Sequence, residues 1–323
     1  MTQLEISSLP RSPELGVLVE QAAKFLEAAR AGSTRKAYAE DLADFRRFTE
    51  RHSLPFLPST PETVALYIAD LASRLSVSTI RRRMAAITNA HKEAGFSNSP
   101  ASPRQHYIVR EVLAGIKRKV GTVQHGVDPL LAEDIRKIVT AGPDNLLGLR
   151  DRALVLVGFS GAFRRSELTS VLEVEDLNFT STGLSIRMRR SKTDQEGKGR
   201  SVDIPFGEFS ETCPVRALLS WLDEAHITTG PVFRAVNRHG YVARNALSPR
   251  SVAKILKRVA ARAGINAVSI AGHSLRAGMV TQAAMNGVEE REIARITGHH
   301  SVGMVRRYIR DGRAFGASAR LGL

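Results

Sequence analysis

Three neighbouring stretches decide the fold: AGHSLRAG at residues 271–278, TGHHS at 297–301 and VRRYIR at 305–310. Together they hold spaced histidines, an arginine and a tyrosine. A fourth stretch, GFSGAFRRSEL at 158–168, adds an arginine that an acid follows three positions later. Attack on a phosphodiester by a phenol needs these groups, because negative charge builds on the phosphate oxygens and a proton must leave the nucleophile. The sequence therefore predicts phosphodiester chemistry at a tyrosine.

The two arginines suit this chemistry best. A planar guanidinium forms two parallel hydrogen bonds to an oxyanion and keeps its charge. Arg164 and Arg276 each fall at the predicted start of a helix, where free N–H groups add to the positive field. Taken alone, His273, His299 or Glu167 would be interpreted as an ordinary structural residue. Their joint order and spacing indicate one catalytic site.

Charge and composition favour a protein that binds DNA inside the cell. The 323 residues carry a net charge of +15, which suggests a polyanionic partner. Both parts of the chain are basic, with 18 Lys and Arg against 12 Asp and Glu in residues 1–127, and 29 against 20 in residues 128–323. The single cysteine, Cys213, excludes an internal disulfide and a Cys-based zinc site. With no apolar run of about 18 residues and no signal peptide, we expect a cytoplasmic, nucleoid-associated protein with no membrane partner.

Residues 13–120 have a helical pattern, after a flexible lead at 1–12 and before a linker at 121–127. Apolar residues recur at helical spacing in five segments. The pattern predicts an all-helical N-terminal domain that binds DNA. The helices after the first are expected to begin at Ser33-Thr34, Thr60-Pro61, Ser76 and about Arg104.

Two basic clusters in this domain are candidates for phosphate contacts: Arg81, Arg82 and Arg83, and Lys117, Arg118 and Lys119. A single basic triplet is often only a solvated helix face. Two triplets in one basic helical domain favour DNA contacts, and an α-helix fits the major groove.

Residues 128–311 form the second predicted domain, which is mostly helical with a small antiparallel sheet. A tail at 312–323 follows. The predicted strands are Leu177–Phe179, Leu184–Met188 and Ser201–Ile204, with a turn at 181–183 and a longer loop at 192–200. The predicted helices are 132–139, 147–159, 214–225, 249–263, 274–286, 289–297 and 301–310.

This pattern resembles the tyrosine recombinase (phage integrase-like) family over nearly the whole chain. GAFRRSEL is similar to the family's first box, in which the catalytic arginine stands three residues before an acid. That resemblance identifies Arg164 as catalytic and Glu167 as the acid that orients the site. HSLR supplies the family's HxxR motif at His273 and Arg276.

The last family box is GH-x(8)-Y, which selects His299 and Tyr308. The chain looks most like the Cre branch, although Cre has Trp where this chain has His299; either ring offers an N–H to a phosphate oxygen. The family also places a general-acid lysine in the loop between the second and third strands. In RRSKTDQEGKGRSVDIP that lysine is Lys192, with Lys198 as the alternative.

The resemblance implies a SAM-like core-binding domain and a catalytic domain that close as a C-shaped clamp around duplex DNA. It implies that Tyr308 becomes linked to a DNA 3′ phosphate, with His273 accepting or relaying its proton. Strand exchange would pass through a Holliday junction without ATP, metal or another cofactor. The implied partners are an inverted-repeat DNA site and three further copies in a tetramer on two sites, assembled from monomers. The tail at 312–323 would dock on a neighbouring protomer.

Two other functions stay open. A type IB topoisomerase-like enzyme uses similar residues, and a DNA-binding regulator could keep the fold without turnover. The helical N-terminal domain and the HxxR motif favour a recombinase over a topoisomerase. A protein that only binds DNA has no need of Tyr308.

Overall fold

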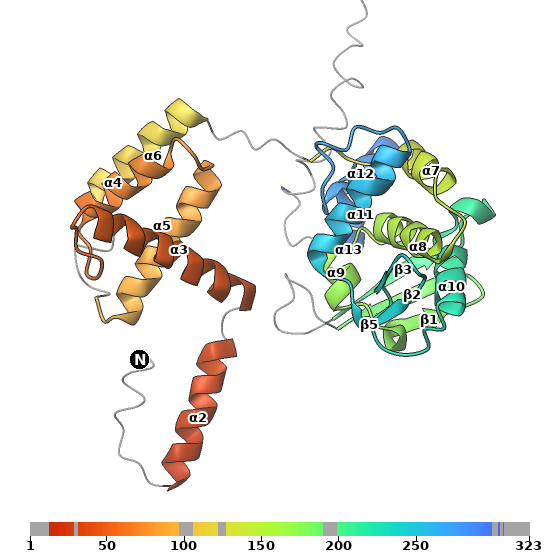
Figure 1. Ribbon diagram of the computed structural model, residues 1–323, viewed down its shortest axis with the longest axis horizontal. Helices are drawn as coiled ribbons and strands as arrows, with labels where there is room; N and C mark the ends of the chain where they lie inside the picture. Colours follow the sequence, from red (N-terminus) through yellow and green to blue (C-terminus); the bar gives the residue numbers. More distant parts are fainter. Residues whose placement is uncertain are drawn as a thin grey trace, which may run out of the picture. The chain divides into compact units, whose positions relative to one another are not determined.

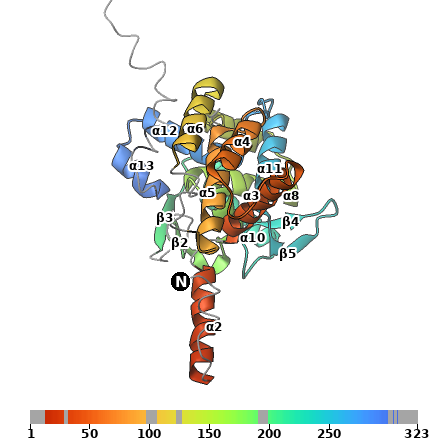
Figure 2. The same cartoon turned by 90° about the vertical axis from the view of Figure 1, so that its left-hand side faces the viewer.

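The computed structural model describes residues 13–28, 32–96, 106–121, 127–189, 199–298, 303 and 306. The chain divides into two compact units, Met1–His125 and Gly126–Leu323. Each unit has its own hydrophobic core, and Figures 1 and 2 draw their elements. In the described part of the chain, no helix has the length and apolar character needed to cross a membrane.

The first unit is helical in all its described elements. Its core centres on aromatic rings, with Phe45 and Phe48 lying 4.9 and 5.2 Å from Tyr67, measured between ring centroids. All three are buried, and such tilted ring pairs add to the free energy gained by burial. The helices are α2 (Pro13–Ala28), α3 (Gly32–Arg51), α4 (Pro61–Leu71), α5 (Val77–Glu93) and α6 (Tyr107–Val120).

Local capping explains where α4 and α5 begin. The hydroxyl of Thr60 accepts a hydrogen bond from the backbone N–H of Thr63, and Pro61 occupies the first helical position. Ser76 caps α5 in the same way. These two predicted starts are confirmed. In contrast, α3 begins at Gly32, so Ser33 and Thr34 lie inside the helix and do not cap it.

The second unit is mostly helical, with a three-stranded antiparallel sheet of order β1-β2-β3 at one edge (Figure 1). Leu184 pairs with Ile204 across β2 and β3, and the three predicted strands are confirmed to within one residue. The elements are α7 (Ala132–Thr140), α8 (Leu146–Ser160), α9 (Arg165–Ser170), η1 (Val174–Asp176), β1 (Leu177–Phe179), β2 (Gly183–Met188), β3 (Arg200–Pro205), η2 (Ser210–Thr212), α10 (Pro214–Glu224), β4 (Arg234–Val236), β5 (Val242–Ala246), α11 (Pro249–Arg262), α12 (Ser274–Met285) and α13 (Glu290–Thr297).

The hairpin of β4 and β5 was not predicted from the sequence. Both strands are short and their pairing contains a register shift, so neither shows a clear alternation. The turn depends on the side chain of Asn237, whose oxygen accepts hydrogen bonds from the backbone N–H groups of His239 and Tyr241.

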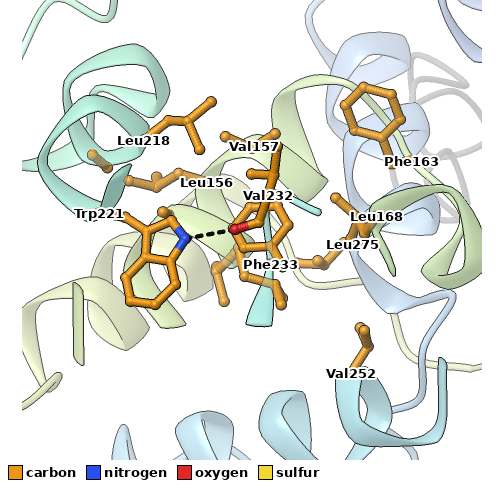
Figure 3. Packing of buried hydrophobic residues seen from close by; sticks show 14 of the residues in the cluster. Leu156, Val157, Phe163, Leu168, Leu218, Trp221, Val232, Phe233, Val252 and Leu275 are labelled. Carbon is orange, nitrogen blue, oxygen red and sulfur yellow. Dashed lines mark hydrogen bonds between the residues drawn. The ribbon is translucent and has the colours of Figure 1, made fainter. Parts of the chain in front are cut away.

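The core of the second unit surrounds α8, which is buried on all sides. Four consecutive residues, from Leu154 to Val157, are at most 3% exposed, as expected of a helix enclosed by other elements. Trp221 lies in the same core, and its indole N–H donates to the carbonyl of Val232 at 2.9 Å (Figure 3). Leu168 and Leu275 extend this packing toward α9 and α12 (Figure 3).

Two glycines let α12 fit closely against its neighbours. A Cβ on Gly278 would lie 1.8 Å from the carbonyl oxygen of Leu130, and one on Gly158 would lie 2.7 Å from Leu275. The N–H of Leu130 also donates to the carbonyl of Ser274 at 3.1 Å. The first turn of α12, which follows His273 and includes Arg276, is therefore fixed against the core.

Candidate active site

Four of the seven predicted catalytic residues belong to the described part of the chain: Arg164, Glu167, His273 and Arg276. The other three, Lys192, His299 and Tyr308, lie outside the described residues, as does the alternative Lys198.

Arg164 and Glu167 form a rigid pair at the start of α9. Arg164 is the N-cap residue, and its backbone N–H donates to Oε2 of Glu167 at 2.8 Å. Its guanidinium Nη1 donates to the other carboxylate oxygen, Oε1, at 2.7 Å. Glu167 is 2% exposed, so both contacts are shielded from water. Charged hydrogen bonds are stronger in such an interior than in solvent. The acid therefore fixes the arginine through backbone and side chain together.

Arg276 connects segments that are far apart in the sequence. It is the third residue of α12 and is 2% exposed. Its Nη1 donates to the carbonyl of Ala162 at 2.8 Å, and its Nη2 donates to the carbonyl of Thr297 at 2.7 Å. Ala162 lies two residues before Arg164, and Thr297 lies two residues before His299 in the sequence. Arg276 thus brings the first box, which contains Arg164, to the HxxR motif. It also holds the end of α13, which leads into the last box in the sequence.

His273 is the exposed N-cap residue of α12, and its carbonyl accepts from Ala277 at 2.9 Å. The preceding Gly272 lies against Arg165, since a Cβ on the glycine would be 2.7 Å from Cδ of that arginine. The start of α12 and the start of α9 are therefore in contact. The side chain of Arg165 packs against the backbone of Gly272, whereas the guanidinium of Arg164 is held by Glu167.

The end of α13 has a defined geometry. Gly298 takes a left-handed conformation with φ of 63°, and its N–H donates back into the last turn of the helix. Such a glycine is a common helix terminator because it carries no Cβ. Further along, Nε of Arg306 donates to Glu290 at 2.9 Å. A residue two positions before Tyr308 is thereby tied to the first turn of α13.

Arg200, the first residue of β3, was not predicted as a site residue from the sequence. Its Nη1 donates to the carbonyl of Ile296 at 2.5 Å, and its Nη2 lies 3.7 Å from Oε2 of Glu167. Burial lowers the pKa of this guanidinium, an effect that Glu167 opposes and Arg164 reinforces. A signal was present in the sequence: alternation along β3 puts Arg200 on the same face as the buried Val202 and Ile204. A charged residue on the core side of a strand indicates a partner inside.

The basic triplet on α5 has two kinds of environment. Arg81 is exposed. Arg82 donates to Asp41 at 3.0 Å. Arg83 is ion-paired with Asp44 and donates to the hydroxyl of Tyr67 at 2.8 Å.

These partners belong to a partly buried network inside the first unit. Tyr67 donates to Asp44 at 2.8 Å. Burial, assisted by the hydrogen bond to Asp44, raises the pKa of Tyr67, and burial also raises the pKa of Asp41. Arg83 is therefore part of the interior of this unit. Arg81 and Arg82 are both exposed, although Asp41 pairs with the Arg82 guanidinium, so Arg81 is the first candidate for a phosphate contact and Arg82 the second. The second basic triplet forms the last turn of α6, where Arg118 and Lys119 are exposed and Lys117 is partly buried.

The described residues contain no group of three or more His, Cys, Asp or Glu side chains arranged to hold a metal ion.

Comparison with known proteins agrees with this arrangement. Residues 129–313 match the phage integrase family, and residues 23–94 match the phage integrase N-terminal SAM-like domain. The chain belongs to the phage integrase family. An integrase/recombinase XerD homolog of Selenomonas ruminantium is 42% identical over 296 residues, which are 91% of this chain and 86% of that protein. The chain is therefore a tyrosine recombinase enzyme of the XerD-like kind.

A more distant relative in sequence and two solved structures with the same fold were also found. The tyrosine recombinase XerC of Syntrophus aciditrophicus is 29% identical over 294 residues, or 88% of each chain. The Tn1549 transposon integrase, solved with transposon right end DNA, has a TM-score of 0.61 at 15% identity and covers 89% of this chain and 92% of its own. The lambda integrase dimer bound to a COC′ core site has a TM-score of 0.58 at 16% identity, covering 96% and 83%. The predicted fold class, a helical N-terminal domain and a mostly helical catalytic domain with a small sheet, is confirmed. Affinity with the Cre branch stays a prediction.

Proposed function

We propose that this recombinase performs site-specific recombination of double-stranded DNA through a covalent 3′-phosphotyrosine intermediate at Tyr308. The observation that carries the proposal is the pair of hydrogen bonds from Arg276. They join the turn before Arg164 to the residue two positions before His299. The first two boxes and the end of α13, which leads into the third box in the sequence, are thereby held together, and this supports a single phosphodiester site.

In the proposed mechanism, Arg164 and Arg276 bind the non-bridging oxygens of the scissile phosphate. Both guanidiniums are held before DNA arrives, so little reorganisation is needed as negative charge develops. Glu167 has no direct contact with the phosphate in this scheme; it orients Arg164. The N–H of the His299 ring adds a further donor to a phosphate oxygen.

Proton transfer completes the scheme. A phenol with an ordinary pKa of about 10 must lose its proton during attack, and His273 accepts or relays it, a role that imidazole suits near neutral pH. Lys192, or Lys198 in its place, protonates the leaving 5′ oxygen. The phosphotyrosine keeps the energy of the phosphodiester bond, so a free 5′-hydroxyl of another strand can displace the tyrosine without ATP.

The wider proposal concerns assembly. Four copies, monomeric before they bind, would act on two inverted-repeat sites in the cytoplasmic nucleoid and exchange strands through a Holliday junction. The first unit would hold the DNA, with Arg81, Arg82 and the basic end of α6 as candidate phosphate contacts. The segment at 312–323 would dock on the next protomer. Structures similar to this chain include complexes with DNA, such as the lambda integrase dimer bound to a core site, and this supports a DNA partner.

Covalent capture tests the chemistry. The protein and its Tyr308→Phe variant are each incubated with labelled DNA fragments from around its own gene, and an SDS gel is examined for protein linked to a 3′ end. We expect an adduct with the wild type and none with the variant, at equal DNA affinity. An adduct in the variant would exclude Tyr308 as the nucleophile. Tight binding by both proteins without an adduct would favour a DNA-binding regulator, and relaxation of supercoils without strand exchange would favour a topoisomerase.

A further inference from the structure

We propose that Arg200 is a positioning residue for strand transfer, which holds the Glu167–Arg164 pair in register with the end of α13. The inference rests on the proposed function, because it assigns a role to Arg200 in placing groups for that reaction. It assigns Arg200 no contact with the phosphate.

Arg200 lies at the start of β3 with its side chain on the core side of the strand. It pairs with Met188, the last residue of β2, so it lies at the base of the strand connection that contains Lys192. Its side chain is 20% exposed and turns to the core side of the strand with Val202. A charged side chain loses hydration energy in such a place, so its partners must compensate for the loss.

Those partners are parts of the candidate active site. Through Nη2, Arg200 approaches the same oxygen of Glu167, Oε2, that accepts the backbone N–H of Arg164. Through Nη1, it donates to the carbonyl of Ile296 in the last turn of α13. One guanidinium therefore connects three elements: the sheet, the start of α9 and the end of α13.

Gly298 lies against the side chain of Arg200. A Cβ at this glycine would lie 3.2 to 3.4 Å from atoms of the Arg200 side chain, among them Nε. The backbone just before His299 thus rests directly on Arg200, in a left-handed conformation that favours glycine.

The consequence for the reaction follows from geometry. Arg164 binds both carboxylate oxygens of Glu167, and Arg200 links this pair to the carbonyl of Ile296 in α13. Without Arg200 that link is lost. Arg164 and the end of α13 would then shift relative to each other. A displacement of about 1 Å in a catalytic group can reduce a rate by about 10²-fold.

The test compares three variants: Arg200→Met, Arg200→Lys and the control Arg187→Met. Arg187 lies on the same sheet, but its side chain is largely exposed and its ion pair is with Asp176 instead of Glu167. Each protein is given the DNA fragment that the wild type captures, at saturating protein, and the rate of adduct formation is measured together with DNA affinity. Amide hydrogen exchange is followed at Arg164 and Gly298, whose N–H groups bond to Glu167 and to the last turn of α13.

We expect Arg200→Met to slow adduct formation about 10²-fold at unchanged DNA affinity, with faster exchange at both amides. Lysine should restore part of the rate, because it keeps the charge but cannot form both contacts. Arg187→Met should match the wild type. In a Glu167→Gln background, adding Arg200→Met should slow adduct formation little further, because the two residues act through the same carboxylate. If Arg200 had a purely structural role, the rate reductions of the two single variants would instead multiply in the double variant.

Wild-type rates in Arg200→Met, or multiplying losses in the double variant, would overturn the proposal. If the wild type itself captures no fragment, the proposed function has failed. The hydrogen-exchange data then test the positioning role of Arg200 without the reaction. Unchanged exchange at Arg164 and Gly298 in Arg200→Met would then show that Arg200 positions neither segment.

Discussion

Arg276 donates a hydrogen bond from Nη1 to the backbone carbonyl of Ala162 at 2.8 Å, and these two residues are 114 positions apart in the sequence. Ala162 has a positive φ of 48°, a conformation that few non-glycine residues adopt. The turn that ends α8 therefore directs its carbonyl to the guanidinium. A residue proposed to bind phosphate is thus also the residue that holds its site together.

Replacing Arg276 with lysine should impair the reaction. One ammonium group cannot reproduce two divergent hydrogen bonds at 2.8 and 2.7 Å. We expect adduct formation to fall by about 10²–10³-fold, the usual loss for one oriented donor, with DNA affinity retained. The matched control is Arg295→Lys, an exposed residue of α13 that pairs with Glu292, which should react at the wild-type rate. Equal losses in both variants would contradict the assignment.

Glu167→Gln should destabilise the second unit. The change leaves an acceptor for the backbone of Arg164 but removes the charge between Arg164 and Arg200, and breaking one partner of a buried ion pair typically costs about 3–5 kcal/mol. Urea unfolding can be followed through Trp221, because it is the only tryptophan in the chain and lies in this core.

The control for Glu167→Gln is Glu292→Gln. Glu292 makes an exposed ion pair with Arg295 at the same three-residue spacing, where solvent weakens the interaction. Its unfolding midpoint should stay close to that of the wild type. A similar midpoint for Glu167→Gln would mean that the buried pair does not stabilise the unit.

Two alanine substitutions at helix ends should differ in their effect on the reaction. Gly298 and Gly287 both have a positive φ, 63° and 81°, so Gly298→Ala and Gly287→Ala share a backbone cost of about 1–2 kcal/mol. Only Gly298 lies against Arg200, since nothing is within 4 Å of a Cβ at Gly287. Adduct formation should therefore slow in Gly298→Ala and not in Gly287→Ala. Equal rates would indicate that this contact is not needed.

Replacement by alanine should affect stability at Arg83 and DNA binding at Arg81. Arg83→Ala removes the partner of Asp44 and Tyr67, and should lower the thermal unfolding midpoint of the first unit, measured by circular dichroism. Arg81→Ala should leave that midpoint unchanged and weaken DNA binding at low salt. Because each phosphate contact releases about one counterion, the slope of log affinity against log salt should fall by about 1. An unchanged slope would remove Arg81 from the DNA interface.

Removal of divalent metal should not stop the reaction. The proposed mechanism uses arginines where other enzymes use metal ions to stabilise the phosphate charge. Adduct formation in the presence of EDTA should proceed at the rate seen without it. A strict requirement for added Mg²⁺ would contradict the proposed mechanism.

Much of this protein could be predicted from local sequence. Helix starts at Thr60-Pro61 and Ser76 follow from capping groups within three residues, and the three strands of the sheet follow from alternation. The three-residue step from Arg164 to Glu167 is also local: it forms a single helical turn in which the acid reaches back to the arginine. The first two family boxes were recognisable for the same reason, because each is short and its spacing is set at the start of one helix.

Only the tertiary structure decided how these local pieces meet. The carbonyl partners of Arg276 come from residues 114 and 21 positions away, and backbone carbonyls have no signature in a sequence. Arg83 looks like an ordinary basic residue until folding partly buries it beside Asp44. For Arg200, alternation along the strand indicates a partner inside, but only the fold identifies that partner as Glu167. The sequence by itself determined which side chains could do the chemistry, since that depends on residue type. Their partners depend on the packing of distant segments, because a buried charge is stabilised by whichever opposite charge or carbonyl the fold brings to it.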